Sequence, residues 1–441
     1  MSKIMLICAP ATSRSGYGDH ARDLIRSLLD ISQKDDKNKF EIKIADVRWG
    51  DCPRNALDKN KPEDKKILDC FLASNNQLDR QPDIYVDIRI PNEFQTAGKF
   101  NIGITAGIES NVVSQEWIEH CNKMDLVIVP SEHSKVGIVQ TVYDKMQDLP
   151  DGQQQKIGEL KLEKPIEVLF EGVRENIYKP LNKNELTEFS DKLDSKLETD
   201  FNFLCVGLWG KGGIGEDRKN IGKMIKIFCE TFSNRDIQPG LILKTNTASF
   251  SILDKEEVSN RINHITSMFP KNWKLPKIYL LHGSLTDKEM NELYNHPKVK
   301  AMISFTHGEG FGRPLLEASM VGLPIIASGW SGQLDFLTDD ESMLVGGNIV
   351  QIPESQVWDN IMIEQSSWFE VDERQASNVI MLMTHEFKNQ KKKALKLMER
   401  NRKEFTLNKM TDKFMKILED KYFSQSLPEE VSIKLPKLKK S

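Results

Sequence analysis

Short apolar segments alternate with segments of helical spacing along this chain, and the alternation begins twice. The strand-like segments of the first half are 3–8, 40–46, 83–88, 100–105, 126–129 and 168–170. After Pro180, residues 181–200 are polar and charged and lack an apolar face, which is typical of a domain junction. The strand-like segments then resume at 201–207, 241–244, 277–281, 301–304 and 324–327. Strands separated by helices predict parallel sheets covered on both faces. We therefore expect an α/β protein with two Rossmann-like domains facing each other across a cleft.

Composition excludes several classes of protein. The 441 residues are 39% hydrophobic, enough to bury large cores, yet no apolar run approaches the length of a membrane helix. The first residues, MSKIMLICAP, are typical of a buried strand rather than a cleaved signal, so we expect a cytoplasmic protein without an integral membrane segment. The formal charge of −4 is not that of a nucleic-acid-binding chain as a whole, although a local basic cleft is compatible with it.

The segment HGEGFGRPLLEA, residues 307–318, carries the clearest chemical signal. It follows the strand-like AMISF, and Pro314 suits the first turn of a helix. Its glycines allow a close approach of the backbone to a ligand, and a helix start favours an anion such as a diphosphate. Glu309 and Glu317 can accept hydrogen bonds from sugar hydroxyls. The alternative is that Glu317 only complements the helix dipole and Glu309 is a surface residue.

This segment resembles the E-x7-E signature of glycosyltransferase family 4, a family with the GT-B fold. Further segments resemble that family in the same order along the chain: SRSGYGDH (13–20), LVIVPSE (126–132), FEGV (170–173), YKP (178–180), RKNI (218–221) and LTDKEMNELY (285–294). The resemblance implies an acceptor-side domain over 1–180 and a nucleotide-sugar-binding domain over 181–405. It also implies that residues 406–441 include a helix that crosses back to the first domain. The last lysines, Lys434, Lys437, Lys439 and Lys440, form a basic tail.

The resemblance implies a retaining glycosyltransferase that needs no metal and no cofactor, with a nucleotide-diphosphate sugar as its donor substrate. Glu309 would contact the transferred sugar, and Glu317 the donor ribose. Lys219 and Arg218 would neutralise the leaving phosphates; the alternative is that this pair is a solvated charged run. The remaining donor-binding candidates are Gly16, Gly18, Lys211, Gly310, Phe311, Gly312 and Leu316. Acceptor-side candidates are Arg14, Tyr17, His20 and Glu109.

Two departures weaken the inference about the acceptor. The segment VGLWGK (206–211) has no arginine where family members often have one, so Lys211 or Arg218 would substitute for it. The loop GITAGIES (103–110) lacks the histidine that many members carry, which leaves Glu109 as its polar group.

The acceptor is expected to be a hydroxyl of a saccharide, a lipid-linked compound or a small molecule. The main alternative is DNA carrying 5-hydroxymethylpyrimidines, because SRSGYGDHARDL and IPNEFQ resemble glycosyltransferases encoded by bacteriophages. A DNA-binding enzyme needs a basic stripe. The residues that could supply it are Arg14, Arg22, Arg26, Arg48, Arg54 and Arg89.

Two other classes of protein remain as alternatives. Residues 16–21 fit G-x-G-x-x-A, and Asp46 ends the second strand, which is a weak fingerprint of an NAD-dependent oxidoreductase. Residues 9–15 separate the first strand from Gly16 by more than the tight turn of that fingerprint. The third class is an inactive nucleotide-sugar-binding protein, which the presence of both glutamates and the basic pair disfavours.

Overall fold

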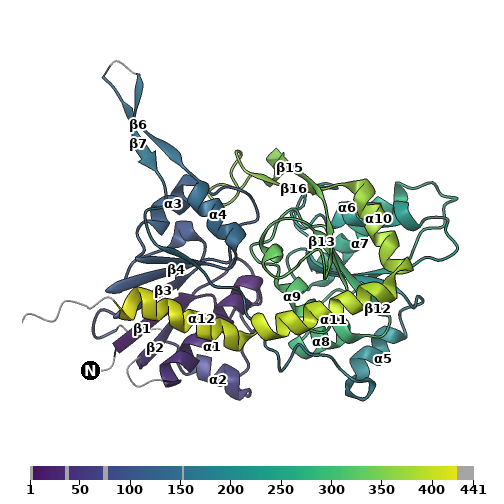
Figure 1. Cartoon of the computed structure of the whole chain (residues 1–441), viewed down its shortest axis with the longest axis horizontal. Helices are drawn as coiled ribbons and strands as arrows, with labels where there is room; N and C mark the ends of the chain where they lie inside the picture. The colour runs from purple at the N-terminus through teal and green to yellow at the C-terminus, as the bar shows by residue number, and fades with distance from the viewer. Residues whose placement is uncertain (1–2, 35–38, 73–77, 151–152, 425–441) are drawn as a thin grey trace, which may run out of the picture.

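The computed structural model describes residues 3–34, 39–72, 78–150 and 153–424. They form two α/β domains that lie next to each other, each with a parallel sheet between layers of helices (Figure 1). The predicted fold class is confirmed.

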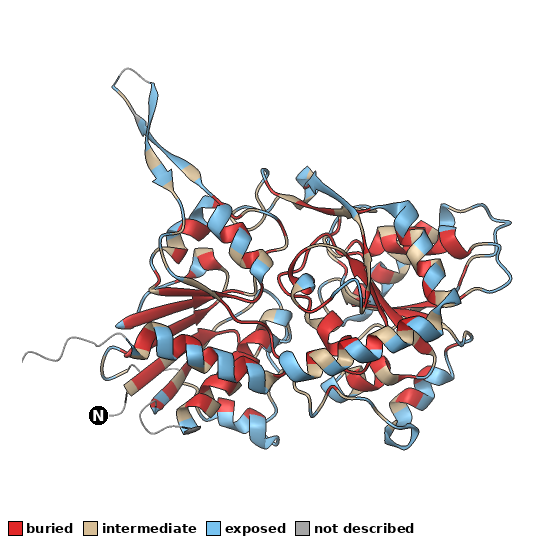
Figure 2. Ribbon diagram, in the orientation of Figure 1, coloured by how far each residue is buried: buried red, intermediate tan, exposed pale blue. Residues whose placement is uncertain are grey.

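The N-terminal domain is built on parallel strands in the order β2-β1-β3-β4-β5-β8. These strands are β1 (Lys3–Ala9), β2 (Phe40–Asp46), β3 (Ile84–Ile88), β4 (Phe100–Ile104), β5 (Leu126–Val129) and β8 (Ile166–Val168). The helices are α1 (Gly16–Lys34), α2 (Pro62–Leu68), α3 (Gln115–Cys121) and α4 (Glu132–Gln140). Every residue of β3, β4 and β5 is buried because helices cover both faces of the sheet (Figure 2).

The C-terminal domain repeats this plan with the strand order β11-β10-β9-β12-β13-β14. Its strands are β9 (Asn202–Leu208), β10 (Gly240–Asn246), β11 (Ile278–Leu280), β12 (Val299–Ser304), β13 (Ile325–Ser328) and β14 (Met343–Val345). Its helices are α5 (Glu188–Asp194), α6 (Ile221–Phe232), α7 (Ile252–Ser267), α8 (Asp287–Asn295), α9 (Arg313–Ser319), α10 (Glu373–His385) and α11 (Phe387–Glu404). The strand order reverses direction between β9 and β12, and ligands of such sheets bind beside the carboxyl ends of the strands at this point.

A long helical path joins the two domains at their base. Helix α11 packs on α9, and α12 (Leu407–Leu418) continues across α1 of the N-terminal domain (Figure 1). The crossing point is fixed by backbone hydrogen bonds from Val173 N–H to the Phe405 carbonyl (3.0 Å) and from Leu407 N–H to the Val173 carbonyl (2.8 Å). The Thr411 hydroxyl on α12 donates to Ser27 Oγ on α1 over 2.8 Å. The domain boundaries after residues 180 and 405 stay predictions, and the predicted basic tail lies outside the described residues.

Two antiparallel ribbons lie outside the parallel sheets. Strands β6 (Tyr143–Asp148) and β7 (Gln154–Leu160) form an arm that projects from the N-terminal domain (Figure 1). These strands were not predicted, because their residues are mostly polar and lack an alternating apolar face. Strands β15 (Gly347–Gln351) and β16 (Ser367–Val371) form the second ribbon. It touches the N-terminal domain where Asn111 N–H donates to the Ser367 carbonyl (3.0 Å).

Candidate active site

Glu309 lies in the loop between β12 and α9, where the two domains meet. It is 9% exposed, and its carboxylate accepts a hydrogen bond from the Lys219 ammonium. Arg218 Nη1 lies 3.9 Å from Glu309 Oε2. The Glu309 backbone N–H donates to Ser331 Oγ over 2.9 Å, which fixes the loop. The structure therefore brings together the three residues that sequence analysis placed at the reacting end of the donor.

The charges in this cluster depend on one another. Burial alone would raise the pKa of Glu309, but Lys219 and Arg218 outweigh burial and hold it below its ordinary value. Glu309 is therefore a carboxylate at neutral pH. Burial lowers the pKa of Lys219, and Glu309 opposes this effect.

The basic pair follows β9 in a loop that packs onto the Glu309 segment. Asn220 ends this loop in the left-handed region (φ 54°), and α6 begins directly after it. The His307 N–H donates to the Arg218 carbonyl over 2.9 Å, so the two loops are joined through their backbones. The Arg218 and Lys219 side chains are also half-buried and paired with Glu109 and Glu309, which disfavours the alternative of a solvated charged run.

Glycines at the domain boundary allow two backbones to touch. A Cβ atom on Gly308 would lie 2.0 Å from the Glu109 carbonyl oxygen, and one on Gly310 would lie 2.1 Å from the Ala106 carbonyl oxygen. We expected these glycines to admit a ligand; in this structure, the backbone that approaches them belongs to residues 106–109 of the other domain. Gly312 has a different role, since its φ of +96° is a conformation that favours glycine at the start of α9.

Polar side chains of the N-terminal domain complete this boundary. Ser131 Oγ donates to the Gly310 carbonyl over 2.6 Å, and Ser134 Oγ lies 3.4 Å from the same oxygen. Glu109 pairs with Arg218 across the boundary at 3.1 Å. Neither serine is a predicted site residue, although Ser131 belongs to the LVIVPSE segment that resembles the family; it follows β5 after one proline and caps α4.

Glu317 lies one turn into α9 and is buried among polar partners. It accepts hydrogen bonds from Arg313 Nε (3.0 Å) and from the Tyr294 hydroxyl (3.2 Å). Burial raises the pKa of Glu317 to about 7, against the opposing effect of Arg313. Arg313 also lies 2.7 Å from Asp23 on α1, so the Glu317 cluster spans both domains. Arg313 and Asp23 were not predicted, because nothing in the sequence places α1 beside α9.

Four of the N-terminal candidates lie at or just before the start of α1: Arg14, Gly16, Tyr17 and Gly18. Gly18 is required sterically, since a Cβ there would lie 2.1 Å from the Ser13 carbonyl, whereas a Cβ on Gly16 would meet no atom within 4 Å. Tyr17 lies against the loop of residues 103–110, with its hydroxyl 2.8 Å from Thr105 Oγ1. Arg14 is exposed and reaches Ser284 Oγ of the other domain at 3.4 Å.

Three donor-binding candidates do not present their side chains to the Glu309 cluster. Phe311 packs against Phe336 in the core with a ring-centroid distance of 5.1 Å, and Leu316 is fully buried. Only their backbone groups are available to a ligand. The Lys211 side chain is exposed and has no partner among the described residues; its carbonyl accepts from Gln356 Nε2 (2.9 Å).

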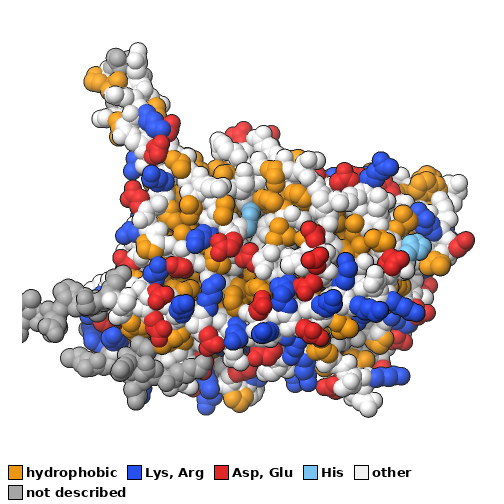
Figure 3. Space-filling model, in the orientation of Figure 1, with side chains coloured by type: hydrophobic (Ala, Val, Ile, Leu, Met, Phe, Trp, Pro, Cys, Tyr) orange, Lys and Arg blue, Asp and Glu red, His pale blue; other side chains and the backbone are white. Residues whose placement is uncertain are grey.

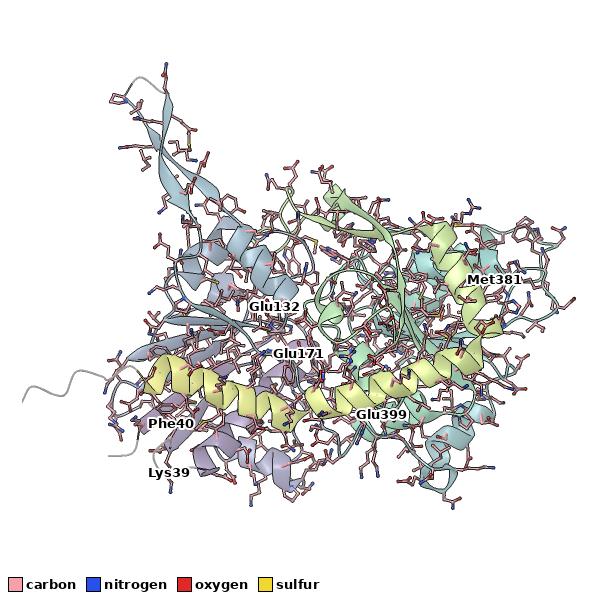
Figure 4. The ribbon with its side chains drawn as sticks, viewed as in Figure 1. Lys39, Phe40, Glu132, Glu171, Met381 and Glu399 are labelled. Atoms are coloured by element: carbon pink, nitrogen blue, oxygen red, sulfur yellow. The ribbon has the colours of Figure 1, made fainter. Side chains whose placement is uncertain are left out.

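His20 and Glu171 form a buried pair at the domain boundary. Figure 4 shows Glu171 there, between the two sheets. His20 Nδ1 lies 3.9 Å from Glu171, and neither ring nitrogen has a hydrogen-bond partner among the described residues. Burial lowers the pKa of His20 to about 4 and raises that of Glu171 to about 8. At neutral pH, both groups are therefore uncharged.

We expect Glu171→Gln to stabilise the protein at pH 8–9. Folded Glu171 keeps its proton up to a pKa of about 8, whereas the unfolded carboxyl loses it near its ordinary value. Stability from this group is thus lost as pH rises between these values, with a total effect on the order of a few kcal/mol. Glutamine is neutral throughout. Thermal unfolding from pH 5 to 9 should show a midpoint difference that grows with pH, while the exposed Glu163→Gln should track the wild type. A constant difference would contradict the assignment.

The arginines named as a possible basic stripe are mostly neutralised within their own domain. The pairs are Arg22 with Asp19, Arg26 with Asp23 and Asp64, Arg48 with Asp51, Arg54 with Asp46, and Arg89 with Asp87. Arg14 instead binds Asn55. The face in Figure 3 likewise shows lysines and arginines intermixed with acidic side chains rather than a uniform basic band.

Asp46, the acidic residue of the dinucleotide fingerprint, is already occupied. It accepts hydrogen bonds from the Thr12 N–H (3.0 Å), the Thr12 hydroxyl (2.6 Å) and Arg54 (2.6 Å). These bonds disfavour the oxidoreductase alternative.

The two domains have the GT-B fold of solved glycosyltransferase structures. Residues 271–361 match the family model described as glycosyl transferases group 1. This segment contains both Glu309 and Glu317, so the predicted resemblance is confirmed. No curated protein sequence matches the chain.

Solved structures of glycosyltransferases have the same fold at low sequence identity. Alr3699/HepE from Anabaena, solved with UDP and glucose, has a TM-score of 0.55 and 13% identity, covering 95% of this chain and 99% of that chain. Sucrose-phosphate synthase from Thermosynechococcus elongatus has a TM-score of 0.58 and 11% identity, covering 96% and 100%. A glycosyltransferase from Rickettsia africae has a TM-score of 0.58 and 14% identity, covering 95% and 98%.

The described residues contain neither a membrane-spanning helix nor a cluster of metal-ligating side chains. None of the helices in that part of the chain is long and apolar enough to cross a membrane. The same residues contain no group of three or more His, Cys, Asp or Glu side chains that could hold a metal ion.

Proposed function

We propose that this chain is a retaining, metal-independent glycosyltransferase that moves a sugar from a nucleotide-diphosphate donor to an acceptor hydroxyl. The observation that carries this proposal is the cluster of buried Glu309 with the half-buried Lys219 and Arg218 at the domain boundary. A leaving nucleoside diphosphate gains negative charge in the transition state, and preorganised cations stabilise that charge. A carboxylate can hold the sugar by accepting hydrogen bonds from its hydroxyls.

Donor binding requires an exchange of charge partners in this cluster. Lys219 pairs with Glu309, and Arg218 pairs with Glu109, so each cation is neutralised by a carboxylate. A bound diphosphate would take over both cations. Glu309 would then be free to accept from the sugar, and Glu109 would be free beside the acceptor. The exchange couples donor binding to the contact between the domains, because Glu109 belongs to the N-terminal domain.

A uridine diphosphate sugar is the donor that we propose first. Alr3699/HepE, which shares the fold, was solved with UDP and glucose and with UDP-glucose. The test is a panel of nucleotide sugars that includes UDP-glucose. A ligand at 100 times its dissociation constant should add about 2.7 kcal/mol of stability. Hydrolysis or transfer of the selected donor should survive EDTA. Loss of activity with EDTA and recovery with magnesium would contradict the metal-independent mechanism, and binding without any turnover would indicate an inactive binding protein.

For the acceptor, we propose a saccharide, lipid-linked or small-molecule hydroxyl rather than DNA. The support is electrostatic, because five of the six candidate arginines are paired with carboxylates and offer no row of free cations to DNA phosphates. Labelled donor should therefore not transfer to duplex DNA containing 5-hydroxymethylcytosine at any salt concentration. Transfer to that DNA that weakens with salt and is absent on unmodified DNA would overturn this assignment.

A further inference from the structure

His307 joins the loop of the basic pair to the β15–β16 ribbon. Its imidazole is fully buried and lies flat on Trp368, with ring centroids 4.2 Å apart and 8° between the planes. Nδ1 lies 2.7 Å from the Phe369 carbonyl oxygen on β16. Nε2 lies 3.0 Å from the Gly215 carbonyl oxygen, in the loop that leads to Arg218.

Both ring nitrogens thus face acceptors. A neutral imidazole has one N–H and can donate to only one of these carbonyls, whereas the imidazolium donates to both. No described residue offers a donor to either nitrogen. The charge state of His307 therefore decides whether the loop and the ribbon are held by one ring hydrogen bond or by two.

The backbone around His307 shows why this bond matters for the site. The His307 N–H donates to the Arg218 carbonyl, and the Phe369 N–H donates to the His307 carbonyl, each over 2.9 Å. Glu309 lies two residues after His307 in the chain. On the other side, the ribbon contacts the N-terminal domain, where Ser367 N–H donates to Asn111 Oδ1 over 2.7 Å. His307 thus lies between the cations, the sugar-binding carboxylate and the domain contact.

We propose that His307 is a positioning residue for donor binding, and that its protonation strengthens binding of the nucleotide sugar by fixing the loop that carries Arg218 and Lys219. This inference rests on the proposed function. His307 itself does not contact the donor in this proposal. The ring acts through the Gly215 and Phe369 carbonyls, while the His307 backbone N–H holds the Arg218 carbonyl in place.

The charged groups near the ring set the direction of the pH effect. Glu370 Oε2 lies 3.4 Å from Nδ1 and favours the imidazolium, while Lys223, which pairs with both Glu370 and Glu373, opposes it. Arg218 supplies a further positive charge in the adjoining loop. Burial lowers the pKa of His307, and the two carbonyls and Glu370 counteract burial only in part. The second hydrogen bond therefore forms as pH falls through this lowered pKa, and donor affinity should rise in the same direction.

The test compares wild type, His307→Gln and His307→Phe in calorimetry with the tightest-binding sugar of the nucleotide-sugar panel, between pH 5 and 8.5. A nucleotide sugar is the right probe because its diphosphate does not titrate in this range. We expect the wild type to bind about tenfold more tightly than either variant at low pH, with the ratio falling toward high pH, as for one hydrogen bond to a charged group. Dividing the wild-type affinity at each pH by that of a variant removes the contribution of Glu317, which titrates in all three proteins.

A matched control and an independent readout make the outcome decisive. His264→Gln, on the exposed side of α7, should leave both affinity and pH profile unchanged. NMR of labelled histidine should show the His307 ring titrating below the ordinary histidine value and shifting upward when the donor binds. The inference would be overturned if folded His307 variants showed the wild-type dependence of donor affinity on pH. It would also be overturned if the His307 ring did not titrate over the pH range in which the affinity changes. Absence of donor binding in the wild type would instead refute the proposed function.

Discussion

Glu309→Gln should lower kcat by about two orders of magnitude or more while the protein stays folded. Glutamine preserves the shape of the side chain and one oxygen that can accept from Lys219. It removes the negative charge that, in the proposed function, holds the sugar and faces the positive charge developing at the reacting carbon. The loss should therefore appear in kcat rather than in the affinity for the donor.

The comparison variant is Glu317→Gln. Glu317 lies in the cluster with Arg313 and Tyr294, away from the Lys219 contact, so this substitution should raise KM for the donor more than it lowers kcat. Steady-state kinetics, donor calorimetry and the thermal midpoint of each variant separate the two cases. A wild-type kcat in folded Glu309→Gln enzyme would show that Glu309 does not have the proposed role.

The parallel sheets and the loop around Glu309 could be predicted from sequence because their signals are local. Strands such as β5, with the sequence LVIV, are buried on both faces and read as short apolar runs. The glycines and Pro314 mark the passage from β12 to α9. Glu309, Lys219 and Arg218 were found because a short motif contains each of them.

The contacts between domains could not be predicted, because they join residues far apart in the chain. Asp23 and Arg313 are 290 positions apart, and the sequence around each fits an ordinary helix. The bonds of Ser131 to Gly310 and of His307 to Gly215 depend on loops whose backbone conformations have no sequence signature. The β6–β7 arm was not predicted for a different reason, because neither strand has an alternating apolar face that would indicate a strand pair.

Gly310→Ala should lower kcat/KM by about a hundredfold or more without unfolding either domain. The added methyl group would lie 2.1 Å from the Ala106 carbonyl oxygen, and backbone atoms cannot yield as a flexible side chain would. The domains would have to separate or shift, which would break the hydrogen bond of Ser131 to Gly310. A displacement of about 1 Å between reacting groups is enough for an effect of this size.

The decisive measurement pairs kinetics with the shape of the donor-bound enzyme. Small-angle scattering should show a larger radius of gyration for Gly310→Ala than for the wild type, at a nearly unchanged thermal midpoint. Gly158→Ala is the matched control, because a Cβ on Gly158 in the projecting arm would meet no atom within 4 Å. It should match the wild type in both respects. Wild-type kcat/KM in Gly310→Ala would show that catalysis does not require the backbone contact between residues 106–109 and the glycine loop. An active site shared between the domains instead requires this contact, because Glu109, which pairs with Arg218, belongs to the segment that the alanine would displace.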